Sequence, residues 1–164
     1  MKIIIGYPPT ESEKGTALLS QNRQFQWFSN PTSMFPVVLG SAATFLKSRG
    51  NDVLWLDCIA EKINQEKFFE IIEKEKPDLF VFETKTPVIK QHWRTINSIK
   101  EKFPNIKIAL VGDHITSFPE ETMKNSKVDF VIKGGDYDFL LEELVDSIKR
   151  KKKIPEGIAY RKKD

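Results

Sequence analysis

Short apolar runs alternate with longer stretches of helical spacing along almost the whole chain. Five runs have strand length, and each leads into a stretch whose apolar residues recur every three or four positions. Parallel neighbours cannot be joined by a tight turn, so this alternation is typical of a parallel sheet with crossover helices. It predicts an α/β fold, a Rossmann-like (flavodoxin-like) three-layer sandwich with a five-stranded parallel sheet. The expected strands are residues 2–6, 52–56, 79–82, 107–111 and 130–132.

Five helices are expected between and after these strands. Pro36 suits the first turn of the first helix, and the second helix stops before Pro77. Residues 7–35 form a polar and aromatic segment that is too long to serve only as a turn. Their aromatic residues form either a lid over a ligand or a cover for the end of the sheet; they are Phe25, Trp27, Phe28 and Phe35. The expected helices are residues 36–48, 65–75, 89–102, 119–125 and 138–150.

The composition is that of an ordinary globular chain in a reducing compartment. Its 164 residues suit one domain, and no apolar run approaches the ~18 residues that cross a bilayer. We therefore expect no membrane partner. Cys58 is the only cysteine, which excludes an internal disulfide and any zinc or iron–sulfur cluster built from several cysteines of this chain. A cytoplasmic location fits best.

Positive charge is concentrated at the end of the chain. Residues 149–164 carry eight basic groups and two acids, a balance of +6, so the preceding residues sum to −3. Basic residues at the end of a helix complement its dipole and suit a solvated linker, which disfavours a nucleic-acid partner. We expect a domain over residues 1–150, then a basic linker and the start of a following segment over 151–164. Residues 158–160 look strand-like but have no expected partner.

Ligands of open parallel sheets bind outside the carboxyl ends of the strands, near the point where the strand order reverses. Glycines in such loops let the backbone approach a bulky ligand, and threonine hydroxyls bind amide or phosphate groups. A single glycine there is more simply a turn residue, but several on one edge favour a site. The candidate binding residues are Tyr7, Pro8, Pro9, Thr84, Lys85, Thr86, Pro87, Gly112, Asp113, His114, Gly134, Gly135 and Asp136. No catalytic residue and no protein metal ligand is assigned.

The two histidines are weak candidates for metal ligands. His114 follows Gly112-Asp113 without a second histidine or cysteine nearby, which favours loop ordering or hydrogen bonding over ligation. His92 lies beside Trp93 on an expected helix and reads as an ordinary helix residue.

Three kinds of site that are common in this architecture have motifs that this sequence lacks. No G-x-G-x-x-G follows the first strand, which disfavours a dinucleotide site. Lys14-Gly15-Thr16 has the wrong order for a phosphate-binding P-loop. A phosphoacceptor receiver would place an aspartate after the third strand, where this chain has Glu83. A small flavodoxin-like enzyme with another ligand ranks last, because no hydroxyl-rich phosphate loop follows the first strand.

At these loops the chain resembles the amino-terminal cobalamin-binding domain of B12-dependent radical SAM enzymes. The resemblance spans nearly the whole chain, and each of its motifs is weak alone but moderately specific in order. The matching motifs are Tyr7-Pro8-Pro9, residues 36–40, Asp57, Thr84-Lys85-Thr86-Pro87, residues 112–116, residues 119–121, residues 128–131 and Gly134-Gly135-Asp136.

The resemblance implies a cobalamin cofactor and a radical SAM domain downstream in the same polypeptide. Residues 7–15 contain no D-x-H-x-x-G motif, which implies a corrinoid without a histidine ligand on its lower face. The iron–sulfur cluster and S-adenosylmethionine would belong to the missing downstream domain, because this chain lacks C-x-x-x-C-x-x-C. This chain alone is then expected to be non-catalytic within a methyltransferase-like enzyme. The alternative is a non-catalytic α/β interaction module whose basic tail binds an acidic partner.

Overall fold

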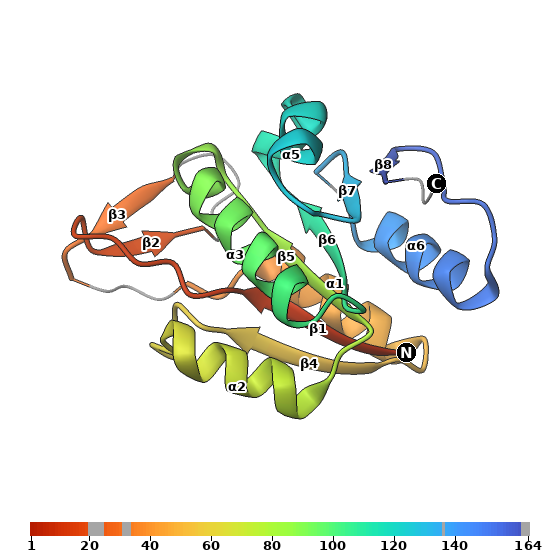
Figure 1. The fold of residues 1–164 in the computed structure, drawn as a ribbon, viewed down its shortest axis with the longest axis horizontal. Helices are drawn as coiled ribbons and strands as arrows, with labels where there is room; N and C mark the ends of the chain where they lie inside the picture. Colours follow the sequence, from red (N-terminus) through yellow and green to blue (C-terminus); the bar gives the residue numbers. More distant parts are fainter. Residues whose placement is uncertain (20–24, 31–33, 136, 162–164) are drawn as a thin grey trace.

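A computed structural model describes residues 1–19, 25–30, 34–135 and 137–161, and shows a six-stranded sheet covered by helices (Figure 1). The first five strands are parallel, and the sixth pairs antiparallel with the fifth. Their order across the sheet is β4 (Asp52–Asp57), β1 (Lys2–Tyr7), β5 (Leu79–Glu83), β6 (Lys107–Val111), β7 (Phe130–Ile132) and β8 (Ile158–Tyr160).

The five predicted parallel strands are confirmed, and their spatial order is flavodoxin-like. Counted along the chain, the second strand lies outermost, the first lies next to it, and the third, fourth and fifth follow. The order therefore reverses between β1 and β5. Crevices at such a reversal are where ligands of doubly wound sheets bind.

The five predicted helices are present, with the first beginning one residue later than expected. Asn64 begins the second helix by accepting a hydrogen bond from the Lys67 amide at 2.9 Å. Two short elements were not predicted, a 3₁₀ turn and the helix that contains His114. The elements are α1 (Val37–Ser48), α2 (Gln65–Glu75), η1 (Thr86–Val88), α3 (Ile89–Lys102), α4 (Asp113–Ser117), α5 (Pro119–Asn125) and α6 (Asp138–Arg150).

Successive residues of β1 point to opposite faces of the sheet and enter two separate cores. Ile3 and Ile5 pack on the face covered by α1 and α6, whereas Ile4 packs on the face covered by α2 and α3. All three side chains are fully buried. Coverage on both faces explains the continuous apolar run, and confirms the predicted three-layer sandwich.

The long segment after β1 contains a small antiparallel pair, β2 (Thr16–Leu18) and β3 (Gln26–Phe28). It extends beyond the carboxyl-terminal edge of the sheet, at the left of Figure 1. Phe25 and Trp27 meet edge to face at 5.1 Å and pack against the α1/α6 core. Phe35 is 65% exposed, with its ring 5.4 Å from that of Trp55.

The carboxyl-terminal strand requires a correction. The sheet has six strands and not five, and residues 158–160 pair antiparallel with β7, so the expectation that they lack a partner is wrong. The pairing satisfies backbone groups that β7 would otherwise leave at an open edge. The boundary after residue 150 stays a prediction. None of the helices that the structure describes has the length and hydropathy of a membrane span.

Arg161 ties β8 to the end of α5, and its removal should loosen that strand. Its Nη2 atom donates to the carbonyl oxygens of Met123 at 2.6 Å and Ser126 at 2.9 Å. We expect Arg161→Ala to lower the free energy of unfolding by about 1 kcal/mol in urea denaturation, because these carbonyls lose a charged donor. Arg94→Ala, on the exposed side of α3, should change it by less than ~0.5 kcal/mol. Equal losses in both variants would contradict the anchoring role.

Candidate functional site

The carboxyl ends of the central strands bring the predicted loops to one edge of the sheet. Gly6 of β1 is level with Phe82 of β5, and Glu83 of β5 is level with Val111 of β6. The loops that follow these strands therefore start side by side at the reversal of strand order.

A chain of charged and hydroxyl groups crosses this edge. The Tyr7 hydroxyl donates to Glu83 Oε2 at 2.7 Å, and both residues are buried. Lys85 Nζ lies 4.0 Å from Glu83 Oε1 and 3.2 Å from Asp113 Oδ2. Lys85 is itself only 4% exposed, so it joins the loops after β5 and β6 from beneath the surface.

Burial shifts the pKa values of Glu83 and Tyr7. It raises the pKa of Glu83, an effect that the Tyr7 hydrogen bond and the Lys85 charge oppose. Burial and the neighbouring Glu83 charge also raise the pKa of Tyr7 far above its usual range. Tyr7 therefore stays a hydrogen-bond donor at neutral pH.

His92 is a functional candidate that the sequence interpretation missed. It is fully buried, and its ring nitrogens contact two threonines: Nδ1 lies 2.8 Å from Thr84 Oγ1, and Nε2 lies 3.2 Å from Thr10 Oγ1. The expectation of an ordinary helix residue is wrong. The helical spacing of Ile89, His92 and Ile96 placed it on the buried face of α3, which was the available signal.

The hydrogen bonds around His92 fit one tautomer. With the proton on Nε2, the ring donates to Thr10, whose hydroxyl then donates to the Pro8 carbonyl at 3.2 Å. Nδ1 then accepts from the Thr84 hydroxyl. Burial lowers the pKa of His92 to about 3, so the ring is neutral and fixes the loop after β1 to the end of β5.

Gly112 allows the next strand to approach this network. A Cβ atom at Gly112 would overlap the Thr84 carbonyl oxygen and lie 3.1 Å from Glu83 Cγ, and its φ of +119° disfavours side chains. The Thr84 amide donates to the Val111 carbonyl at 2.9 Å. Thr84 is fully buried, so its hydroxyl serves the internal network.

His114 lies on α4 and packs inward. Its Nδ1 atom lies 3.1 Å from Thr86 Oγ1, and its ring lies 5.4 Å from that of Phe118. Its Nε2 atom is 3.3 Å from Glu121 Oε2 without the geometry of a hydrogen bond. Thr86 and Pro87 are exposed, whereas Pro8 and Pro9 are buried.

The loop after β7 has open space beside its glycines. A Cβ atom at Gly134 or Gly135 would meet nothing within 4 Å. Asp136 lies outside the described residues. Tyr137 follows and is only 3% exposed, and its hydroxyl has no hydrogen-bond partner among the described residues.

Exposed apolar side chains gather on the segments that follow these strands. Among the described residues, six large apolar side chains are exposed. Met34, Phe35 and Val37 precede or begin α1, and Phe118 joins α4 to α5. Exposed apolar side chains of this size are candidates for contact with a ligand or another domain.

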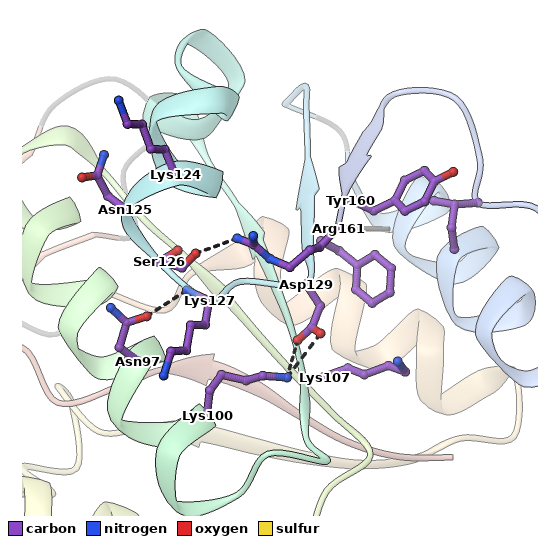
Figure 2. Close-up of a pocket in the computed structure, with 12 residues that line it drawn as sticks. Asn97, Lys100, Lys107, Lys124, Asn125, Ser126, Lys127, Asp129, Tyr160 and Arg161 are labelled. Carbon is purple, nitrogen blue, oxygen red and sulfur yellow. Dashed lines mark hydrogen bonds and ion pairs between the residues drawn. The ribbon is translucent and has the colours of Figure 1, made fainter. Parts of the chain in front are cut away.

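Two hollows lie on opposite edges. One of about 290 Å³ lies at the carboxyl-terminal edge, between the loops that follow β1 and β4, with Thr10, Cys58 and Asn64 on its walls. A larger one of about 820 Å³ lies at the opposite edge, beside the start of β6 and β7 and the end of β8 (Figure 2). In the larger hollow, Asp129 holds Lys100 at 3.0 Å. The described residues contain no group of three or more His, Cys, Asp or Glu side chains arranged to hold a metal ion.

Comparison with known proteins adds a family to this geometry. Residues 31–142, more than half of the chain, match the family model of the B12 binding domain. An uncharacterized methyltransferase of Pyrococcus horikoshii is 25% identical over 163 residues, covering 98% of this chain and 33% of that protein. The anaerobic magnesium-protoporphyrin IX monomethyl ester cyclase of Rubrivivax gelatinosus is 27% identical over 132 residues, covering 76% of this chain and 24% of that protein. The chain thus spans about a third of the length of the first relative and about a quarter of the length of the second.

The buried His92 predicts a pH-dependent stability. Its pKa is about 3 in the folded chain against 6.5 unperturbed, so the unfolded chain binds the extra proton. The stability contributed by neutral His92 is complete above pH 6.5 and is lost as pH falls toward 3, by up to ~1.4 kcal/mol per pH unit. We expect His92→Gln to flatten the dependence of unfolding free energy on pH between about 6 and 4, measured by urea denaturation.

Thr84→Val is the matched control. It removes one hydrogen bond to the ring but keeps the buried imidazole, so it should lower stability by about 1 kcal/mol at every pH and preserve the slope. A slope that is the same in wild type and His92→Gln would show that His92 is not the buried neutral base described above.

Proposed function

The chain belongs to the family of B12-binding domains, and from this premise we propose that it holds cobalamin across the carboxyl-terminal edge of the sheet. The family supports the predicted cofactor, cobalamin. The binding residues proposed at this edge come from the loops after β1, β5, β6 and β7, as the sequence predicts.

One observation carries the proposal: the edge combines an open glycine loop with exposed apolar side chains. Gly134 and Gly135 leave room for a bulky group, and Phe35 and Val37, where α1 begins, are 65% and 67% exposed. A corrinoid is large and mostly neutral, so it suits a broad apolar surface with a few polar groups. The exposed Thr86 and the backbone groups of the glycine loop supply such polar groups.

The polar groups beneath the edge fit a bound cofactor because they fix the loops that would contact it. His92 holds Thr10 and Thr84, and Lys85 holds Asp113, so the loops after three strands have fixed positions. When bound, cobalamin would supply a cobalt centre for methyl transfer or radical chemistry. Residues 7–15 contain no histidine, and we propose that this chain gives the cobalt no histidine ligand from the loop after β1.

The parent protein is proposed to be a B12-dependent radical SAM enzyme of the cytoplasm. Both relatives are several times longer than this chain, and one is named a methyltransferase, the other a cyclase. In the proposed enzyme, a radical SAM domain beyond residue 164 would cover the corrinoid and hold the iron–sulfur cluster and S-adenosylmethionine. The exposed apolar rim at Phe35, Val37 and Phe118 is the surface that such a domain would cover.

Retention of a corrinoid tests the proposal. The purified chain is incubated with hydroxocobalamin and desalted, and its absorption spectrum is recorded; equilibrium dialysis gives the affinity. We expect Gly135→Leu to weaken binding about tenfold or more, because a side chain fills the open loop without meeting protein atoms. Lys124→Leu, beside the hollow at the opposite edge, is the control and should bind normally. Absence of corrinoid binding by the wild type would rule out the proposed function.

A second candidate, binding of an acidic partner, is favoured by the basic hollow of Figure 2. Five of its lining residues are cationic, Lys100, Lys107, Lys124, Lys127 and Arg161, against one acid, Asp129. Protein oxygens already engage Lys100 and Arg161, which leaves fewer charges for a partner. If a nucleic acid is that partner, its binding should weaken steeply with salt, and this dependence should lessen when Lys124 and Lys127, which line the hollow, are replaced by glutamine. Salt-independent binding would contradict it.

A further inference from the structure

The three tyrosines of this chain have three different surroundings. The Tyr7 hydroxyl donates to Glu83 at 2.7 Å beneath the carboxyl-terminal edge. Tyr160 is 37% exposed and lines the hollow at the opposite edge. Tyr137 is 3% exposed, yet its hydroxyl has no partner among the residues that the structure describes. A buried hydroxyl without a partner is destabilising, so this one calls for an explanation.

The position of Tyr137 connects it to the proposed site. It directly follows the open glycine loop after β7 and precedes α6. Its ring packs in the core cluster that contains Ile132 and Leu141. Burial raises the pKa of Tyr137 above its usual range, and the negative charges of Glu83, Asp138 and Asp113 add to the effect. The hydroxyl therefore keeps its proton and lies within the field of the carboxylates at the edge.

The described part of the loop before Tyr137 has open space beside its glycines. The space where side chains of Gly134 and Gly135 would begin is empty of protein atoms within 4 Å. Among the described residues of this loop, the Gly134 amide donates to Thr116 Oγ1 at 3.1 Å. A ligand can reach this buried hydroxyl only if the protein atoms over it shift, so the proposal below includes such a shift on binding.

We propose that the Tyr137 hydroxyl donates a hydrogen bond to a carbonyl oxygen of an amide side chain on the corrin ring. The inference rests on the proposed function. A neutral amide fits better than a phosphate, because Glu83, Asp113 and Asp138 would repel an added negative charge. Tyr137 would then be a binding residue that the sequence interpretation did not include.

Tyrosine-to-phenylalanine variants at the three positions test the assignment in the full 164-residue chain. Tyr137→Phe should leave the thermal midpoint of the corrinoid-free protein unchanged or slightly higher, because the hydroxyl it removes has no partner among the described residues. It should weaken hydroxocobalamin binding about 3- to 10-fold, the value of one net hydrogen bond. Tyr7→Phe should lower the midpoint by about 2–4 °C through loss of its bond to Glu83. Tyr160→Phe should change neither quantity.

A second probe identifies the group that Tyr137 contacts. Cobinamide keeps the ring amides but lacks the nucleotide, so the same fold-loss with cobinamide supports a ring amide. A loss confined to hydroxocobalamin would overturn that assignment. Unchanged corrinoid affinity in Tyr137→Phe, or a midpoint lowered as far as in Tyr7→Phe, would overturn the role of Tyr137 while leaving the proposed function intact. A wild type that binds neither corrinoid overturns both, and is seen before any variant is compared.

Discussion

Because β1 lies between β4 and β5, the chain leaves the first strand toward one side of the sheet and returns on the other. The connections diverge at this point, so no crossover helix closes the carboxyl-terminal edge above it. The same central position buries β1 on both faces, and its isoleucines divide between two cores. Strand order thus supplies both the stability of the centre and the opening at which the candidate site lies.

The opening is kept in shape by polar groups that do not reach its surface. His92 joins the loop after β1 to the end of β5, and Lys85 lies between Glu83 and Asp113. Buried polar groups of this kind are stabilising only when each has its partner. Among the described residues at the same edge, the Tyr137 hydroxyl and His114 Nε2 have no hydrogen-bond partner, and the Tyr137 hydroxyl is the group that we propose a ligand satisfies.

The basic hollow and the candidate cofactor surface lie at opposite ends of the parallel strands. The basic hollow and the tie from Arg161 to α5 lie at the amino-terminal edge of the parallel strands, where β8 closes the sheet. The candidate cofactor surface lies at the other edge, where Phe35 and Val37 are exposed. The central strands β1, β5 and β6, which are buried over nearly their whole length, separate the two edges.

The sequence alone determined the five parallel strands, the five main helices and the loops that meet at one edge, because periodicity and the strand-end rule depend on local pattern. It did not determine the pairing of residues 158–160, which depends on a β7 edge that exists only once the sheet forms. It also missed His92 and Tyr137: helical spacing placed His92 on a buried face, but nothing local indicated its contacts with Thr10 and Thr84, or that the Tyr137 hydroxyl has no partner among the described residues. Those properties are set by neighbours distant in sequence, so only the tertiary structure decided them.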